Sequence, residues 1–557
     1  MIFIVNAGTL FRLPLRTSQQ AESSLLSKRA LSVDEARNLL EALRLEASAM
    51  LLFLKNIESI EICEWVQGRT EKNRIFSCNI MNITQELRGK RSFVGVLADK
   101  DKEDKNKKNS NVSTVDFSLV IDCEHSTGHA RNEFNTVLDS LGYEMERETT
   151  RYDEKWEVCN QLGGESSNII ANNPLNTLLR LIPWGGVAVC TNPKPLLLNT
   201  TPSSSSDMIE FDHIESQIDK SNDDDKDKGE EDDIGRLKPG LAYCFLPLPI
   251  LTGLPVMVNG FFELSSNRRD IWQSGQSGSM GGEMTGDGRT RAEWNLSLMR
   301  DVISPSYVRL LVRARDIMGF SDFFQGLFPS VVASPWSLIV DSTLARCRNE
   351  KLLYVTAPTS TDINSTDTMI LKNQNDKGSM NRINSGNNDN NSTVGSWVLC
   401  SQAVLLPHTN MTSRDRQYPT VQSLSREQEN KLSDFLLHVG QPLIRCTNEL
   451  NKALQISKTC DIMATPSYVR TVLRTYSKKQ TIEMMYKPSS SLCATFLLEY
   501  CISDLNPSAI RDCSELDSLP LLPLRGGGVG TINMLTPTNA ANVEVLCGMG
   551  YSLSRSV

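Results

Sequence analysis

Two adjacent arginines, Arg268 and Arg269, are the residues of this chain best suited to chemistry. They stand in a polar turn that follows the Pro-punctuated apolar run in residues 241–272. A guanidinium group stays charged and donates hydrogen bonds in a planar fork that matches phosphate or carboxylate oxygens. The turn therefore favours an anion site, with phosphate as the expected anion. The alternative is a surface turn whose arginines pair with Asp270 and other carboxylates.

A metal site is not expected. Cys123, Glu124, His125 and His129 lie within seven residues, and imidazoles four apart on a helix can share a metal. Here the residues between the two histidines are Ser, Thr and Gly, which break a helix, and no fourth ligand is evident. The stretch is better described as a solvated loop.

Nucleophilic and phosphate-loop chemistry have no support either. The chain contains no G-x-S-x-G sequence, and no Gly-Lys-Ser/Thr follows the glycines of residues 526–530. Those glycines instead predict a turn between two strands in residues 519–534.

Length and composition indicate a multidomain globular protein. A chain of 557 residues is too long for a single hydrophobic core. Its hydrophobic (39%) and charged (22%) fractions are ordinary for a globular protein. A net charge of −8 argues against a nucleic-acid binder. The 14 cysteines form no C-x-x-C pair, which fits a reducing compartment. No apolar run approaches the roughly 20 residues of a membrane helix.

Periodicity places the arginine turn in a mixed α and β chain. Ser32 and Glu35 form a capping box that predicts a helix start. A Ser/Thr-Pro-Ser-Tyr-Val-Arg phrase occurs at 304–309 and at 465–470, and we interpret both as an N-cap with Pro in the first turn. We expect helices over 32–56, 173–182, 293–318, 432–454, 466–476 and 490–504, and strands over 57–66, 74–80, 115–121, 155–159 and 185–190.

Four polar tracts interrupt this pattern. They are rich in charge, Ser, Asn or Gly and bury too little apolar area to offset chain entropy, so we expect disordered surface insertions. They lie near residues 99–111, 200–234, 274–290 and 359–393.

Short phrases along the chain carry a family resemblance. Together and in order they resemble the repeated unit of sacsin-type proteins, across nearly the whole chain outside the polar tracts. The phrases stand at 8–16, 183–188, 245–249, 259–269, 397–398, 403–404, 497–501, 519–524 and 530–531.

The resemblance implies a mixed α/β (α+β) multidomain fold. In that family a GHKL-type ATPase domain precedes a middle domain like that of the ninety-kilodalton heat-shock chaperone and a helical and mixed region. Residues 1–18 would be remnant C-terminal strands of the ATPase domain. Residues 19–330 would be the middle-like α/β domain, and residues 331–557 the C-terminal α+β region.

The resemblance also implies an incomplete nucleotide site. By that match Thr9 faces adenine and Gly8 lies beside it. The family's catalytic Glu, metal-binding Asn, Asp-x-Gly turn and glycine lid have no counterpart in this sequence. One strand supplies about 1 kcal/mol of hydrogen bonding, whereas micromolar binding needs roughly 8 kcal/mol. We therefore expect a partial repeat that alone neither binds nor hydrolyses ATP, although ATP and Mg serve the parent family.

By the same resemblance the arginines acquire a role. In the related chaperone an Arg after a Leu-x-x-Ser turn reaches the terminal phosphate of ATP, and residues 264–268 look similar. Arg268 is the better candidate and Arg269 the second, as groups that stabilise charge on a transferred phosphoryl.

The expected function is a non-catalytic fragment of a sacsin-type chaperone that binds client or partner proteins, with its apolar surface around 245–262. One alternative is a half that completes a GHKL ATPase in trans through Arg268. Another is a scaffold whose polar loops carry binding motifs. Expected partners are client or chaperone proteins and the absent ATPase domain, with no nucleic acid, membrane, metal or cofactor for the chain alone. The expected location is cytoplasmic or nuclear.

Overall fold

The computed structural model divides the chain into two compact units, which we call unit 1 (Met1–Leu310) and unit 2 (Leu311–Val557). The sequence-based domain limits at 18 and 330 remain a prediction. The described residues are 16–25, 27–30, 32–64, 73–92, 112–126, 149–192, 240–273, 286–356, 395–407, 424–444, 446–477, 491–505, 515–516, 519, 521–523 and 529–530.

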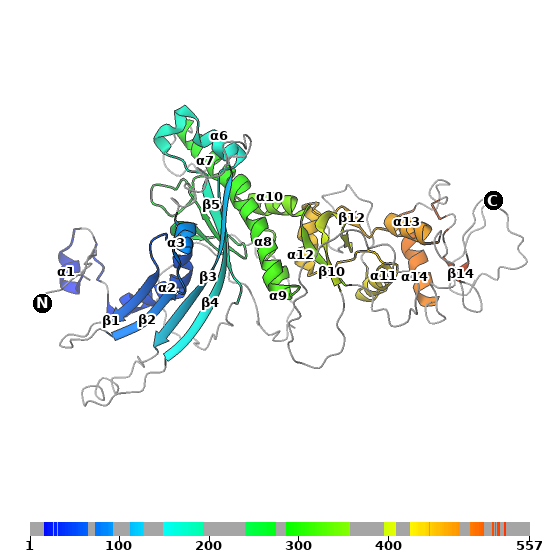
Figure 1. The fold of residues 1–557 in the computed structure, drawn as a ribbon, viewed down its shortest axis with the longest axis horizontal. Coiled ribbons are helices and arrows are strands. Elements are labelled where there is room, and N and C mark those ends of the chain that lie inside the picture. Colours follow the sequence, from blue (N-terminus) through cyan, green and yellow to red (C-terminus); the bar gives the residue numbers. More distant parts are fainter. Residues whose placement is uncertain are drawn as a thin grey trace, which may run out of the picture. The chain divides into compact units, whose positions relative to one another are not determined.

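The described part of unit 1 is built on an eight-stranded sheet, in the order β1-β2-β3-β4-β5-β8-β6-β7. Figure 1 labels its first five strands. Its neighbours pair antiparallel, except that β6 and β8 are parallel. β3 and β4 exceed the predicted lengths because they pair along their whole length. The strands are β1 (Ser59–Glu64), β2 (Asn73–Ile80), β3 (Ser113–Ser126), β4 (Thr149–Leu162), β5 (Trp184–Cys190), β6 (Leu241–Cys244), β7 (Leu246–Leu251) and β8 (Met257–Gly260).

Helix α2 (Val33–Phe53) packs on β1, β2 and β3. Its capping box is as predicted: the Ser32 hydroxyl accepts from the Glu35 amide at 3.1 Å, and the Glu35 carboxylate accepts from the Ser32 amide at 2.7 Å. Its apolar face closes a core that includes Leu51, Phe76 and Ile121. The other helices of unit 1 are α1 (Ser18–Ser23), α3 (Gln85–Arg91), α6 (Glu165–Ala171), the 3-10 helix η1 (Pro174–Leu179) and α7 (Gly286–Leu298).

A π-helical turn, η3 (Met299–Ile303), joins α7 to α8 (Ser304–Met318) without a break. Ser304 was expected to be an N-cap, but its backbone is helical (φ −60°, ψ −44°), so that prediction is wrong. A proline has no N–H to donate to the carbonyl four residues earlier in an α-helix. The π turn just before Pro305 has a different bonding pattern, so Pro305 can stand inside a continuous helix. At the second copy of the phrase, Thr465 does cap: its hydroxyl accepts from the Tyr468 amide at 3.3 Å.

Unit 2 packs its helices around a separate core that includes Leu436, Leu473 and Leu497. A hairpin of two short strands stands where the glycines of 526–530 predicted it. The elements are α9 (Asp322–Gly326), α10 (Ser337–Cys347), β9 (Lys351–Thr356), β10 (Gly395–Leu399), η4 (Cys400–Gln402), β11 (Val404–Leu405), α11 (Arg426–His438), α12 (Asn448–Ile456), β12 (Ile462–Met463), α13 (Pro466–Ser477), α14 (Ser491–Ile502), β13 (Leu522–Pro523) and β14 (Val529–Gly530).

Two other expectations need correction. The predicted helix over 432–454 is broken: α11 ends at His438, Gly440 adopts φ +71°, and α12 begins only at Asn448. A glycine in the left-handed conformation ends a helix because it turns the chain so that the following amides donate to the last carbonyls of the helix. In addition, α7 begins at Gly286, within the insertion expected near 274–290. The other polar tracts lie outside the described residues.

The mixed α/β, multidomain fold class is confirmed. Searched over the described residues, the structure contains no helix long and apolar enough to cross a membrane. In the same part of the chain no three His, Cys, Asp or Glu side chains gather as metal ligands would.

Candidate functional site

Arg268 and Arg269 lie at the tip of a tight hairpin that follows β8. An antiparallel bridge joins Leu264 to Ile271, and the Trp272 amide donates to the Glu263 carbonyl at 2.8 Å. The hairpin is thus closed at its base by main-chain hydrogen bonds, and both arginines are exposed. We call residues 263–272 the arginine hairpin.

Side chains within the hairpin determine the direction of its tip. The side-chain Oδ1 of Asn267 accepts from the Arg269 amide at 3.0 Å and from the Ser265 hydroxyl at 2.7 Å. The Ser265 oxygen in turn accepts from the Asp270 amide at 3.1 Å. Arg268 is held at φ +57°, a left-handed conformation that costs a non-glycine residue of order 1 kcal/mol. The hydrogen bonds around it offset that cost.

Asn295 of α7 fastens the hairpin to the rest of unit 1. Its Nδ2 donates to the Glu263 carbonyl at 2.8 Å and to the Trp272 carbonyl at 2.9 Å, and its Oδ1 accepts from the Glu263 amide at 2.9 Å. Asn295 itself is 1% exposed, and its main-chain partners in Glu263 and Trp272 are half-buried. One buried amide therefore grips both strands of the hairpin.

A second contact on α7 supports the same base. Arg291 Nη1 lies 2.6 Å from Glu263 Oε2, and its guanidinium lies over the Trp272 ring. Burial raises the pKa of Glu263, and the charge of Arg291 opposes that rise. The pair thus joins α7 to the base of the hairpin.

The guanidinium groups at the tip remain available. Within the described part of the chain, neither Arg268 nor Arg269 forms a salt bridge, and Asp270 does not pair with them. Burial raises the pKa of the Cys244 thiol. A hydrogen bond to the Phe262 carbonyl and the charge of Arg268 both oppose that rise. The hairpin thus presents positive charge outward beside a half-buried thiol.

Among the described residues, none of the other predicted site residues lies in the arginine hairpin. Gly8, Thr9 and His129 lie outside the described residues. The solvated loop expected around Cys123 and His125 is wrong for its described part: both residues lie on β3, Cys123 is buried, and burial lowers the pKa of His125. The arrangement around the arginines can therefore be assessed only as an anion-binding tip, and the nucleotide contacts remain a prediction.

The recurring Pro-Ser-Tyr-Val-Arg phrase holds two structural arginines that the sequence analysis missed. Arg309 donates to the Asn160 carbonyl at 2.9 Å and pairs with Asp116. Arg470, 3% exposed, lies 2.5 Å from Asp504 Oδ1 and donates to the Cys501 carbonyl. The repetition of the arginine at one position of the phrase was the available signal. In each unit the helix that contains the phrase is tied to a neighbouring segment through this arginine.

The comparisons with known proteins point to one family. Residues 4–77 match the family model described as the sacsin domain. The chain is 24% identical to human Sacsin over 565 aligned residues. The alignment covers 93% of this chain and 10% of human Sacsin. The chain thus spans about a tenth of the length of this curated relative. No solved structure matches it. With one match at the start of the chain and another along nearly all of it, the chain is similar to sacsin-type proteins.

Proposed function

We propose that this chain binds client or partner proteins as a non-catalytic part of a sacsin-type chaperone. The observation that carries the proposal is a set of aliphatic side chains on α6 and η1 that stand in solvent. We call Ile169, Leu175 and Leu178 the aliphatic patch.

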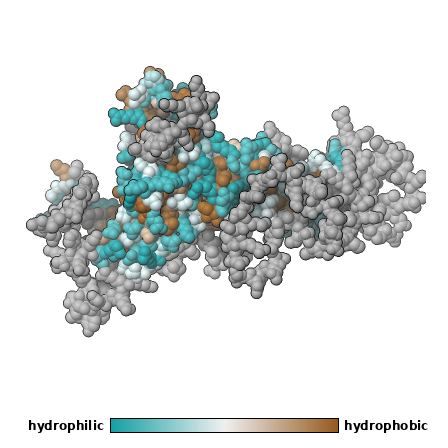
Figure 2. Space-filling model, viewed as in Figure 1, coloured by the Kyte–Doolittle hydropathy of each residue, from teal (hydrophilic) through white to brown (hydrophobic). Residues whose placement is uncertain are grey.

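The exposure of this patch is unusually high. Ile169 is 70%, Leu175 88% and Leu178 94% exposed. Fully burying one such side chain contributes about 1.5–3 kcal/mol, so a partner that covers all three gains appreciable free energy. Figure 2 shows apolar surface among hydrophilic surface at the end of unit 1 where α6 and α7 lie. The stretch first expected to bind clients, 245–262, buries Phe262 and packs Phe245 against Phe261, and its Leu246 and Leu251 are less exposed than the patch, at 50% and 51%.

The patch stands on a firmly held support. Helix α6 has Gly164 as its N-cap and therefore no capping side chain of its own. Asp301 of η3 caps the helix instead. Its Oδ2 accepts from the Ser166 amide at 2.9 Å and from the Ser166 hydroxyl. A Cβ on Gly164 would lie 2.7 Å from the Asp301 Cβ, so glycine is what permits this approach. A rigid support lowers the entropy cost of binding.

Suppression of client aggregation tests the proposal. The full chain is mixed with an unfolding model protein at equimolar ratio, and light scattering is followed. We expect suppression by the unchanged chain and its loss in the double variant Leu175→Ser with Leu178→Ser. Val331→Ser, at a residue 71% exposed in unit 2, serves as control. Absence of suppression by the unchanged chain would reject the proposal.

The arginine hairpin supports a second candidate, in which the chain completes a GHKL ATPase supplied by another polypeptide. The carrying observation is the exposed guanidinium of Arg268 on a braced turn. An arginine delivered in this way stabilises charge on the transferred phosphoryl. In such a complex ATP and Mg would be held by the other domain.

Steady-state ATP hydrolysis distinguishes this candidate. A GHKL domain is assayed with and without the chain, and we expect turnover to rise on addition. Arg268→Ala should remove the gain, whereas Arg269→Ala should keep most of it. Equal stimulation by the Arg268 variant would show that this guanidinium has no part in the reaction.

A further inference from the structure

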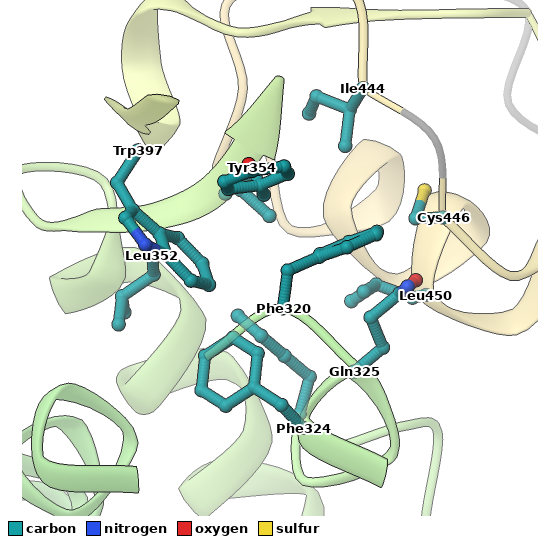
Figure 3. A pocket seen from close by; sticks show the side chains of 11 residues that line it. Phe320, Phe324, Gln325, Leu352, Tyr354, Trp397, Ile444, Cys446 and Leu450 are labelled. Carbon is teal, nitrogen blue, oxygen red and sulfur yellow. The ribbon is translucent and has the colours of Figure 1, made fainter. Parts of the chain in front are cut away.

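Unit 2 contains an aromatic pocket that none of the preceding proposals uses (Figure 3). Its walls come from α9, from the paired strands β9 and β10, and from the segment that leads into α12. Rings meet at close range: Tyr354 and Trp397 at 5.2 Å between centroids, Phe324 and Trp397 at 5.5 Å. We call it the Phe320 pocket. The residues that matter here are Phe320, Phe324, Gln325, Tyr354, Trp397 and Leu450.

One polar group in this lining lacks a partner among the described residues. Gln325 is 9% exposed, and its Oε1 is buried with no hydrogen-bond donor from that part of the chain. A buried acceptor without a donor costs about 1–3 kcal/mol, so such groups in folded proteins call for a specific explanation. Figure 3 shows the Gln325 amide among the lining side chains, on the side of Leu450 and Cys446. The Cys446 thiol does not supply the donor, because it forms no hydrogen bond with Oε1.

Phe320 covers this space without being part of the core. It is 42% exposed, and its ring stacks on Tyr354 at 4.7 Å. It follows Gly319, which adopts φ +65° and where an added Cβ would meet no described atom within 4 Å. The cavity under the ring measures only about 10 Å³, close to the least volume that holds one water. Any larger occupant must therefore displace the Phe320 ring.

We propose that the Phe320 pocket binds an apolar residue of an extended peptide, with Phe320 as the side chain that gives way. The entering side chain takes the place of the Phe320 ring against Tyr354 and Leu450. The peptide N–H of the same residue donates to Gln325 Oε1. An unfolded client offers both groups, since its backbone amides are not yet paired. This inference rests on the proposed client-binding function and specifies one of its binding sites.

The probe is a heptapeptide with a central leucine flanked by serine and glycine. Its binding to the full chain is measured by saturation-transfer NMR. A second peptide carries an N-methyl group on that leucine, which removes the donor and keeps the side chain. We expect saturation of the leucine methyl groups and about tenfold weaker binding of the N-methyl peptide, the effect of one lost hydrogen bond to a buried acceptor. A peptide with central serine is the control for the side chain.

Two variants test the residues. In Gln325→Met, which keeps the size and removes the acceptor, both peptides should bind equally, and the unfolding temperature should not fall. In Phe320→Ala, which opens the mouth, the leucine peptide should bind several-fold more tightly. A persisting tenfold preference in Gln325→Met, or no methyl saturation with the unchanged chain, overturns the inference and leaves a cavity for water only.

The outcome is separable from that of the proposed function. If the chain suppresses aggregation and Gln325→Met suppresses equally, clients bind at the aliphatic patch, and the pocket is rejected as a client site. If the leucine peptide binds as described but aggregation is not suppressed, the pocket stands and the chaperone proposal falls.

Discussion

Asn295 and Trp272 are joined by a hydrogen bond of 2.9 Å, from the side-chain amide of one to the main-chain carbonyl of the other. This bond ties α7 to the far strand of the arginine hairpin, while a matching bond to Glu263 holds the near strand. The position of Arg268 therefore depends on a buried amide in a helix that contributes nothing to the tip itself.

Replacement of Asn295 by Ala should destabilise unit 1 by about 2–4 kcal/mol, because three half-buried main-chain groups lose their partner at once. The measurement is urea unfolding of the full chain, read as a shift of the first transition. Leu296→Ala, at a 36% exposed position of the same helix, is the control and should change stability by less than about 1 kcal/mol. Equal losses in the two variants would show that Asn295 does not brace the hairpin.

Removal of the Arg268 charge should raise the pKa of Cys244. Burial already raises that pKa, and the guanidinium opposes the rise, so Arg268→Ala leaves less thiolate at any given pH. Alkylation of Cys244 by iodoacetamide, followed by peptide mass spectrometry, should slow, and its pH profile should move to higher pH. Arg269→Ala should leave the profile unchanged. Unaltered alkylation in the Arg268 variant would contradict the placement of the guanidinium beside the thiol.

Loss of the Asp504 carboxylate should destabilise unit 2 strongly. Arg470 is buried, and Asp504→Ala would leave its charge with only the Glu515 carboxylate, 4.0 Å from Nε, as counter-ion, so we expect a loss of about 3 kcal/mol. Chemical denaturation measures the loss. Asp461→Ala breaks the exposed pair with Arg348 and should cost at most about 1 kcal/mol. A small effect at Asp504 would mean that water reaches Arg470.

Alanine at Gly186 should destabilise the sheet. A Cβ there would lie 2.2 Å from Asn160 Oδ1 and 2.4 Å from the Cys159 carbonyl, so β4 and β5 must separate. We expect a loss of about 1–3 kcal/mol in thermal or urea unfolding. Gly89→Ala in α3, where no described atom lies within 4 Å of the added methyl group, should instead gain about 0.5–1 kcal/mol. The same sign of change in both variants would contradict this packing.

Local signals in the sequence predicted much of the fold. The Ser32 and Glu35 capping box marked the start of α2, and alternating or apolar runs marked β1 to β5. These signals work because capping and strand patterning involve residues close together in the chain. The sequence also singled out the pair Arg268 and Arg269, although their proposed contact with phosphate remains a prediction.

Other features depended on partners far away in the chain. Nothing near Asn295 indicates that its amide is buried against the hairpin, and nothing near Ser304 indicates that a π turn replaces the expected helix start. The Phe320 pocket is formed by three segments that are separate in the sequence. The solvent exposure of Leu175 and Leu178 depends on how other segments pack around η1.

Sequence patterns alone were thus enough to predict the mixed α/β class, the first five strands of the large sheet and the resemblance to sacsin-type proteins. Only the tertiary structure decided which polar groups are buried, which arginines are exposed and which apolar side chains remain uncovered. The physical reason is that hydrogen-bond satisfaction and burial are properties of residues brought together by folding, whereas periodicity and capping are properties of neighbours along the chain.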